Sequence, residues 1–161
     1  NISSSLAGLW LSKVDFELKE EIILPALLQE IGKFILSDLI VSENKTELFK
    51  SKVASGCSIE EVERELFGFT TSEITSKIFR YWKLSENLIR MIEFVDNIEK
   101  ASDEYKKKTQ ILDVIKTACQ VSAPLSDSNV EKAIEKANKY GLDTKILKKA
   151  IEILQDRLLD E

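Results

Sequence analysis

The chain has 161 residues and a formal net charge of −5 at pH 7, from 23 Lys and Arg against 28 Asp and Glu. Hydrophobic residues make up 43% and charged residues 32%, which is typical of a folded chain of one domain or two small ones. The acidic balance argues against nucleic-acid binding, which normally needs a basic face. Only 5 Gly and 2 Pro are present, and this disfavours architectures with many strands and tight turns.

The sequence contains no histidine. This excludes Ser-His and Cys-His nucleophile pairs, His-ligated zinc or haem, and any imidazole general base. Cys57 and Cys119 have no CxxC spacing, and we expect them to be buried or half-buried free thiols of a reducing compartment. No run reaches about 18 apolar residues and no secretion signal is recognisable, so we expect a cytoplasmic protein that does not bind membranes.

Apolar residues recur at spacings of three and four in almost every segment, which predicts helices. The first broad stripe runs from Leu18 to Leu39; Pro25 lies inside it, so this helix either begins near the proline or is kinked there. Seven more helices are predicted, at about residues 46–55, 58–67, 70–82, 85–95, 103–119, 128–140 and 144–159. No strand pattern appears. The fold class is therefore predicted as all-α, a multi-helix bundle of about eight helices.

Local signals mark several helix ends. Ser58 with Glu61, and Thr70 with Glu73, have the spacing of capping boxes, in which each member satisfies a free backbone amide at the helix start. Pro124 interrupts the helical pattern. We therefore expect a helical domain over residues 1–122 and a C-terminal helical hairpin over residues 123–161 that packs on it.

Three blocks of the sequence resemble the HDOD family, which is related to the HD superfamily. The most extensive block spans residues 68–85, in which Gly68, Glu73, Trp82 and Leu84 match the family pattern and Thr70-Thr71 replaces an Asp-His pair. The other blocks span residues 26–33 and 92–97. In them Gln29-Glu30 stands for a His-Asp pair and Val95-Asp96 for a His-His pair.

The resemblance covers about residues 20–122 and implies an HD-superfamily type of bundle in which the family's N-terminal helices are missing or have diverged. It also implies a site, since HD-superfamily enzymes hydrolyse phosphate esters with divalent metals held by histidines and aspartates. Here the histidines are lost, so we expect no catalytic residue, no metal ligand and no cofactor. The candidates for a vestigial ligand-binding site are Gln29, Glu30, Lys33, Thr71 and Asp96.

The function implied by the resemblance is a non-catalytic regulatory module of bacterial signal transduction. Its expected partners are signalling proteins, among them response-regulator or cyclic di-GMP components, with a nucleotide as a further ligand class that Lys33 could contact through phosphate. The alternative is a divergent metal-dependent phosphohydrolase that uses carboxylates alone. An ion pair between Glu30 and Lys33, three residues apart, is the purely structural interpretation of those two charges.

Overall fold

The structure is a computed structural model that describes residues 1–160. Over this range the chain forms ten α-helices and one short 3-10 helix, with no strand. The predicted all-α class is confirmed. No helix of these 160 residues is both long and apolar enough to cross a lipid bilayer.

The chain divides into two compact units. Unit 1 holds Asn1–Leu28 and the residues from Ala101 on, whereas unit 2 is the continuous segment Gln29–Lys100. The chain therefore leaves unit 1 after α2 and re-enters it before α8. The predicted division at residue 122 follows different bounds and stays a prediction about domains.

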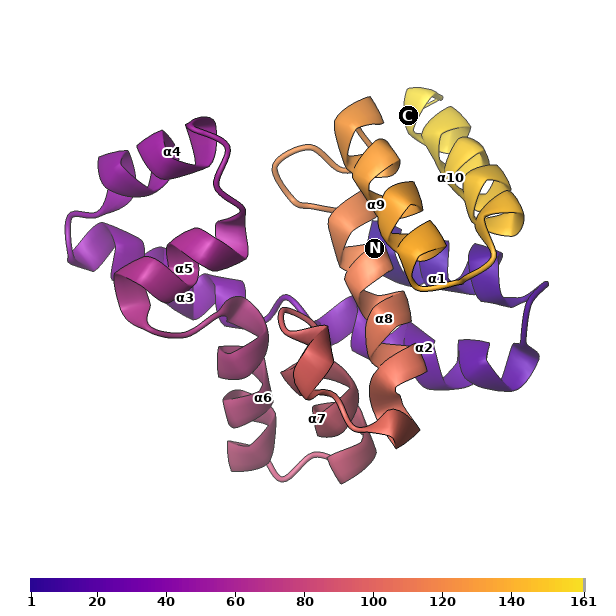
Figure 1. Ribbon diagram of the computed structural model, residues 1–161, viewed down its shortest axis with the longest axis horizontal. Helices are drawn as coiled ribbons and strands as arrows, with labels where there is room; N and C mark the ends of the chain where they lie inside the picture. The colour runs from indigo at the N-terminus through magenta and orange to yellow at the C-terminus, as the bar shows by residue number, and fades with distance from the viewer. Residues whose placement is uncertain (161) are drawn as a thin grey trace. The chain divides into compact units, whose positions relative to one another are not determined.

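Unit 1 contains α1 (Ile2–Leu11), α2 (Phe16–Leu28), α8 (Asp103–Ala118), α9 (Asp127–Lys139) and α10 (Thr144–Leu159). The helix α8 contacts α1, α2 and α9, and α10 contacts α1 and α9 (Figure 1). All six residues 111–116 of α8 are buried, as expected for a helix covered on every side. The largest core side chains of unit 1 are Leu6, Trp10, Leu11, Ile22, Ile111, Leu112, Ile115 and Leu147.

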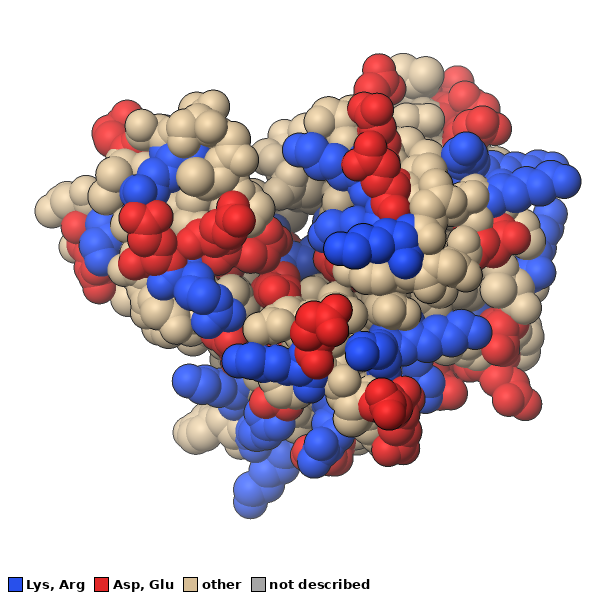
Figure 2. Space-filling model, viewed as in Figure 1, with Lys and Arg blue, Asp and Glu red and all other residues tan. Residues whose placement is uncertain are grey.

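The outer surface of unit 1 carries a marked charge pattern. Acidic side chains stand in a column over α9 (Figure 2). The acidic residues of this helix are Asp127, Glu131 and Glu135, which are spaced by four and so share one face.

Unit 2 contains α3 (Gly32–Ser42), α4 (Thr46–Ala54), α5 (Ile59–Phe67), α6 (Thr71–Tyr81), α7 (Glu86–Glu93) and the 3-10 helix η1 (Ile98–Lys100). Here α6 is central, because it contacts both α3 and α7, while α4 contacts α3 and α5. Arg80 of α6 forms a two-pronged ion pair with Glu93 of α7, with both N–O distances at 2.9 Å. This hydrogen-bonded carboxylate raises the pKa of Arg80.

The two capping boxes predicted in unit 2 are confirmed. Ser58 caps α5 by accepting from the Glu61 amide at 3.2 Å, and the Glu61 carboxylate accepts from the Ser58 amide at 2.8 Å. Thr70 and Glu73 form the second capping box, at the start of α6. The helix α5 ends at Gly68, whose φ of +79° is a left-handed conformation that suits glycine.

Two predictions about the N-terminal third of the chain are wrong in detail. The stripe from Leu18 to Leu39 is two helices: Pro25 lies within α2, and the break comes after it, at residues 29–31. A further helix, α1, precedes it, with the Asn1 side chain as its cap. Three consecutive serines at residues 3–5 weaken the helical pattern there, and burial of the α1 apolar face outweighs their low propensity.

Both cysteines are free thiols. Cys119 is buried at the end of α8, as expected. Cys57 is exposed, in contrast to the prediction, because it lies in the solvated turn between α4 and α5.

Candidate functional site

The five candidate residues all belong to unit 2 and lie at helix ends. Gln29 and Glu30 form the turn before α3, and Lys33 is in the first turn of α3. Thr71 is the first residue of α6, and Asp96 follows α7. The candidates are thus positioned by the start of α3, the start of α6 and the end of α7.

The turn before α3 is held directly against α6. The Gly32 amide donates to the Thr75 hydroxyl at 2.9 Å, and this hydroxyl oxygen lies 3.2 Å from the Gln29 carbonyl oxygen and 2.8 Å from that of Thr71. The hydroxyl proton can serve one of those two carbonyls at a time. The structure therefore brings the backbones of Gln29 and Thr71, 42 residues apart in sequence, within hydrogen-bonding distance of one buried hydroxyl.

Gly32 makes this approach possible. A β-carbon at this position would lie 2.6 Å from the Thr71 carbonyl oxygen and 2.8 Å from the Thr75 hydroxyl oxygen. Both distances are far below a normal van der Waals contact. Glycine is therefore required here by space.

Thr71 is fully buried and binds a buried carboxylate, that of Glu63 in α5. The Thr71 amide donates to one Glu63 oxygen at 2.8 Å, and the Thr71 hydroxyl donates to the other at 2.7 Å. Glu63 is 2% exposed. A buried carboxylate is costly unless it accepts such hydrogen bonds, so this pair fixes the start of α6 against α5.

Asp96, which follows α7, makes a similar contact with the next residue of α6, Ser72. Its carboxylate accepts from the Ser72 amide at 3.2 Å. The Glu73 carboxylate in turn accepts from the Thr70 amide at 3.1 Å and pairs with Arg64 at 2.8 Å. Three carboxylates, from α5, α6 and the segment after α7, thus surround the amino end of α6, where free amides and the helix dipole favour negative charge.

Glu30 and Lys33 form an ion pair, as the structural interpretation of their spacing predicts. Their side chains are about a quarter exposed, with relative accessibilities of 23% and 24%. Both carboxylate oxygens of Glu30 are buried, so the exposed part of its side chain is the aliphatic stem. The role of the five candidates as ligand-binding residues stays a prediction.

Glu63 is a buried charged residue of the site that the sequence-based prediction missed. A signal for it exists. The apolar stripe of α5 contains Ile59, Val62 and Leu66, and Glu63 lies on the same stripe, four residues after Ile59. A charge in an apolar stripe indicates a buried, hydrogen-bonded group.

A comparison with known families settles the kinship of the chain. The family model described as "HDOD domain" matches residues 3–98, which is more than half of the sequence. The chain belongs to the HDOD family. The resemblance seen in the three sequence blocks is thereby confirmed. The HDOD match starts before residue 20, where the predicted resemblance begins, and ends at residue 98. No match is found among curated proteins.

Two solved structures share the HDOD-type fold with this chain. A virulence factor from Campylobacter jejuni subsp. jejuni aligns with a TM-score of 0.69 and 20% identity, over 92% of this chain and 57% of its own length. A "putative phosphohydrolase" from Shewanella amazonensis SB2B aligns with a TM-score of 0.59 and 20% identity, over 95% of this chain and 60% of its own length. This HDOD chain thus spans less than two thirds of the length of either relative.

The HD superfamily implies a divalent metal, and the residues of this HDOD chain can be tested against it. Such a metal needs several nitrogen or oxygen ligands that converge on one point. Asp96 and Glu63 instead accept hydrogen bonds from α6, and Glu30 faces the Lys33 ammonium. Within residues 1–160, no group of three or more His, Cys, Asp or Glu side chains is placed to hold a metal ion. The residues therefore do not fit the metal centre of the superfamily.

Proposed function

We propose that this HDOD chain is a non-catalytic regulatory module of bacterial signal transduction, which acts by binding a protein or a small ligand. The observation that supports this best is that the carboxylates of Glu63 and Asp96 are already bound by the start of a helix. Their carboxylates accept from the amides of Thr71 and Ser72 at the start of α6. In this arrangement the positive end of a helix stands where a cation would otherwise balance the negative charge.

Hydrolysis of a phosphate ester would need an activated water molecule and a group that takes up its proton. A metal ion lowers the pKa of such a water, and an imidazole is the commonest proton acceptor near neutral pH. The sequence has no histidine, and the donor set at the site does not fit a metal. Both points favour binding over turnover.

The second candidate is a divergent phosphohydrolase that uses carboxylates alone. It is favoured by the structural likeness to the Shewanella amazonensis protein, whose name describes a phosphohydrolase. In that case Glu30 would be the carboxylate to test, because Asp96, the other acidic candidate, already accepts a hydrogen bond from the Ser72 amide.

The expected partners are signalling proteins of the response-regulator or cyclic di-GMP systems, and a nucleotide is the small ligand to test first. The Lys33 ammonium lies beside Glu30 in the first turn of α3. If a phosphate binds there, Lys33 is the cation that would contact it.

The deciding experiment combines binding and turnover on the whole chain. The melting temperature is measured with divalent metals and with a nucleotide panel that includes cyclic dinucleotides, and the same preparation is assayed for phosphatase and phosphodiesterase rates. We expect no rate above buffer. A nucleotide that binds at the site should raise the melting temperature, since a ligand at 100 times its Kd stabilises the native state by about 2.7 kcal/mol.

Matched variants identify the site. Lys33→Ala should remove the nucleotide effect, and Lys50→Ala, which alters an exposed lysine of α4, should leave it unchanged. A hydrolytic rate that Glu30→Ala abolishes and Glu47→Ala leaves intact would overturn the proposal in favour of the phosphohydrolase. No shift with any nucleotide would leave protein binding as the mode of action.

A further inference from the structure

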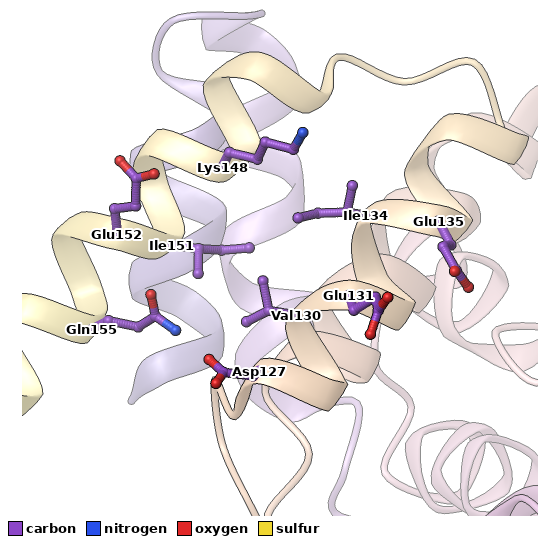
Figure 3. Close-up of a pocket in the computed structure, with 9 residues that line it drawn as sticks. All are labelled: Asp127, Val130, Glu131, Ile134, Glu135, Lys148, Ile151, Glu152 and Gln155. Atoms are coloured by element: carbon purple, nitrogen blue, oxygen red, sulfur yellow. The ribbon is translucent and has the colours of Figure 1, made fainter.

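A groove lies between α9 and α10 on the surface of unit 1, in a part of the chain that follows the HDOD match. Its volume is about 510 Å³. It is lined by Asp127, Val130, Glu131, Ile134 and Glu135 from α9, and by Lys148, Ile151, Glu152 and Gln155 from α10 (Figure 3). None of these residues belongs to the candidate site of unit 2.

The floor of the groove is apolar. Val130 and Ile134 are half-buried on α9, one turn apart, and the buried Ile151 of α10 points towards them (Figure 3). The opposite faces of both helices are already used, because Ala133, Ala137, Leu147, Ala150 and Leu154 are buried in the core. The floor therefore presents the partly exposed atoms of Val130 and Ile134 outward, while Ile151, which is 1% exposed, adds almost no accessible surface.

The rim of the groove is acidic. Residues 127–160 contain seven basic and seven acidic side chains, so this segment is neutral as a whole. The groove, however, is lined by four acidic residues and a single basic one, Lys148, and the Glu135 and Glu152 side chains lie at its outer edges (Figure 3). Lys136 of the same helix is directed elsewhere, since its ammonium donates to Asp113 of α8 at 2.7 Å. The column of acidic side chains over α9 in Figure 2 is the visible part of this separation.

We propose that this groove is a docking surface for an amphipathic helix of a partner protein, with an aliphatic ridge flanked by Lys and Arg. The spacing favours a helical occupant, because Val130 and Ile134, the partly exposed apolar residues of the floor, are four residues apart on α9. Such a row accepts the ridge of another helix, as in known helix-in-groove complexes. The four carboxylates select basic flanks and repel acidic partners, including nucleic acid.

The test uses the whole chain and a labelled synthetic helix of about 18 residues, with Leu at every third or fourth position and Lys on both flanks. Its affinity is measured by fluorescence polarisation at two salt concentrations. A scrambled peptide of the same composition controls for net charge. We expect saturable binding at least about tenfold tighter than that of the scrambled peptide, and weaker at high salt because the rim contacts are solvated.

Two charge-reversal variants locate the binding. Glu135→Lys on the rim should weaken the peptide about tenfold, while Asp156→Lys, an exposed residue of α10 that does not line the groove, should change affinity less than about twofold. Equal effects of the two variants, or equal affinity for the scrambled peptide, would overturn the proposal. A chain that sediments as a dimer and is dissociated by Glu135→Lys would also overturn it, because the occupant would be a second copy. None of these three outcomes affects the proposed function of unit 2.

Discussion

At Gly32 a single missing methyl group decides how closely two helices can approach. The amide of this residue donates to Thr75, and its α-carbon faces the Thr71 carbonyl. Backbone oxygen cannot move aside as the end of a flexible side chain can. The cost of any larger residue here is therefore a displacement of α3 from α6.

Gly32→Ala should destabilise the chain by about 1–3 kcal/mol, as overpacking of a tight contact does, despite the better helix propensity of alanine. Gly8→Ala is the matched control, because Gly8 is also helical but a β-carbon there would have no atom within 4 Å. That variant should be neutral or more stable by up to about 1 kcal/mol. Urea unfolding of both variants checks the difference, and a Gly32→Ala as stable as Gly8→Ala would refute the close approach.

Residue-level prediction of the site succeeded for charges that act locally and failed for those that act across helices. The Glu30–Lys33 pair follows from a spacing of three. The bond between Glu63 and Thr71 joins two helices, and the local sequence gives only the misplaced charge on the apolar stripe of α5. The partner of that charge depends on how α5 and α6 pack, which spacing does not contain.

Hydrogen bonds to a buried carboxylate join α8 to α9 and the residue that follows it, in addition to apolar packing. The Asp113 carboxylate of α8 accepts from the Lys136 ammonium at 2.7 Å and from the Tyr140 hydroxyl at 2.6 Å. The Asp113 side chain is only 8% exposed, while that of Lys136 is 41% exposed. The Asp113 carboxylate, which is shielded from water, thus depends on these two donors to balance its charge.

Asp113→Asn should lower the free energy of unfolding by about 1–3 kcal/mol, because the amide loses the charge that both donors address. Tyr140→Phe removes one donor and leaves the ammonium, so it should cost only about 0.5–1.5 kcal/mol. Thermal and urea unfolding of the two variants give the ranking. If Tyr140→Phe were the more damaging, the ammonium would not be the main partner of Asp113.

Helix boundaries were predictable wherever capping chemistry is local. Ser58 with Glu61 and Thr70 with Glu73 mark the starts of α5 and α6 in the sequence, and Gly68 marks the end of α5. The break at residues 29–31 was not predictable in the same way. The sequence shows an unbroken apolar stripe there, and the interruption is stabilised by the hydrogen bond of Gly32 to Thr75 in another helix.

Over the whole molecule, burial is distributed very unevenly among the helices. Nine of the sixteen residues of α8 are buried, and none of the nine residues of α4 is. Local opening is easiest where few contacts must be broken. The two helices therefore mark the two ends of the range of local stability.

Hydrogen exchange of the native chain should follow this order. Amides of α8, above all residues 111–116, should exchange at a rate near that of global unfolding, and the amides of α4 should exchange fastest among the helical ones. Residue-resolved exchange by NMR measures both in one sample. If α4 were as protected as α8, contacts beyond those within this chain would have to stabilise α4.

The groove between α9 and α10 is also a property of the whole molecule. Its charged rim can be listed from the sequence, but the sequence of residues 127–160 reads as a neutral pair of helices. Only the packing of α9 on α8 and of α10 on α1 decides which charges turn outward together.

The indole of Trp10 in α1 donates to the carbonyl oxygen of Asp143, at 3.2 Å and 133 residues further along the chain. On the ribosome, α1 is made long before the helix that covers it. At a typical synthesis rate of 5–20 residues per second, the delay is roughly 7 to 27 s. During that time the part of α1 that packs on α10 lacks its partner, although α2 can already pack on α1 and unit 2 is complete by residue 100. The nascent chain therefore carries a partly covered apolar helix for seconds, long enough for a chaperone to bind it.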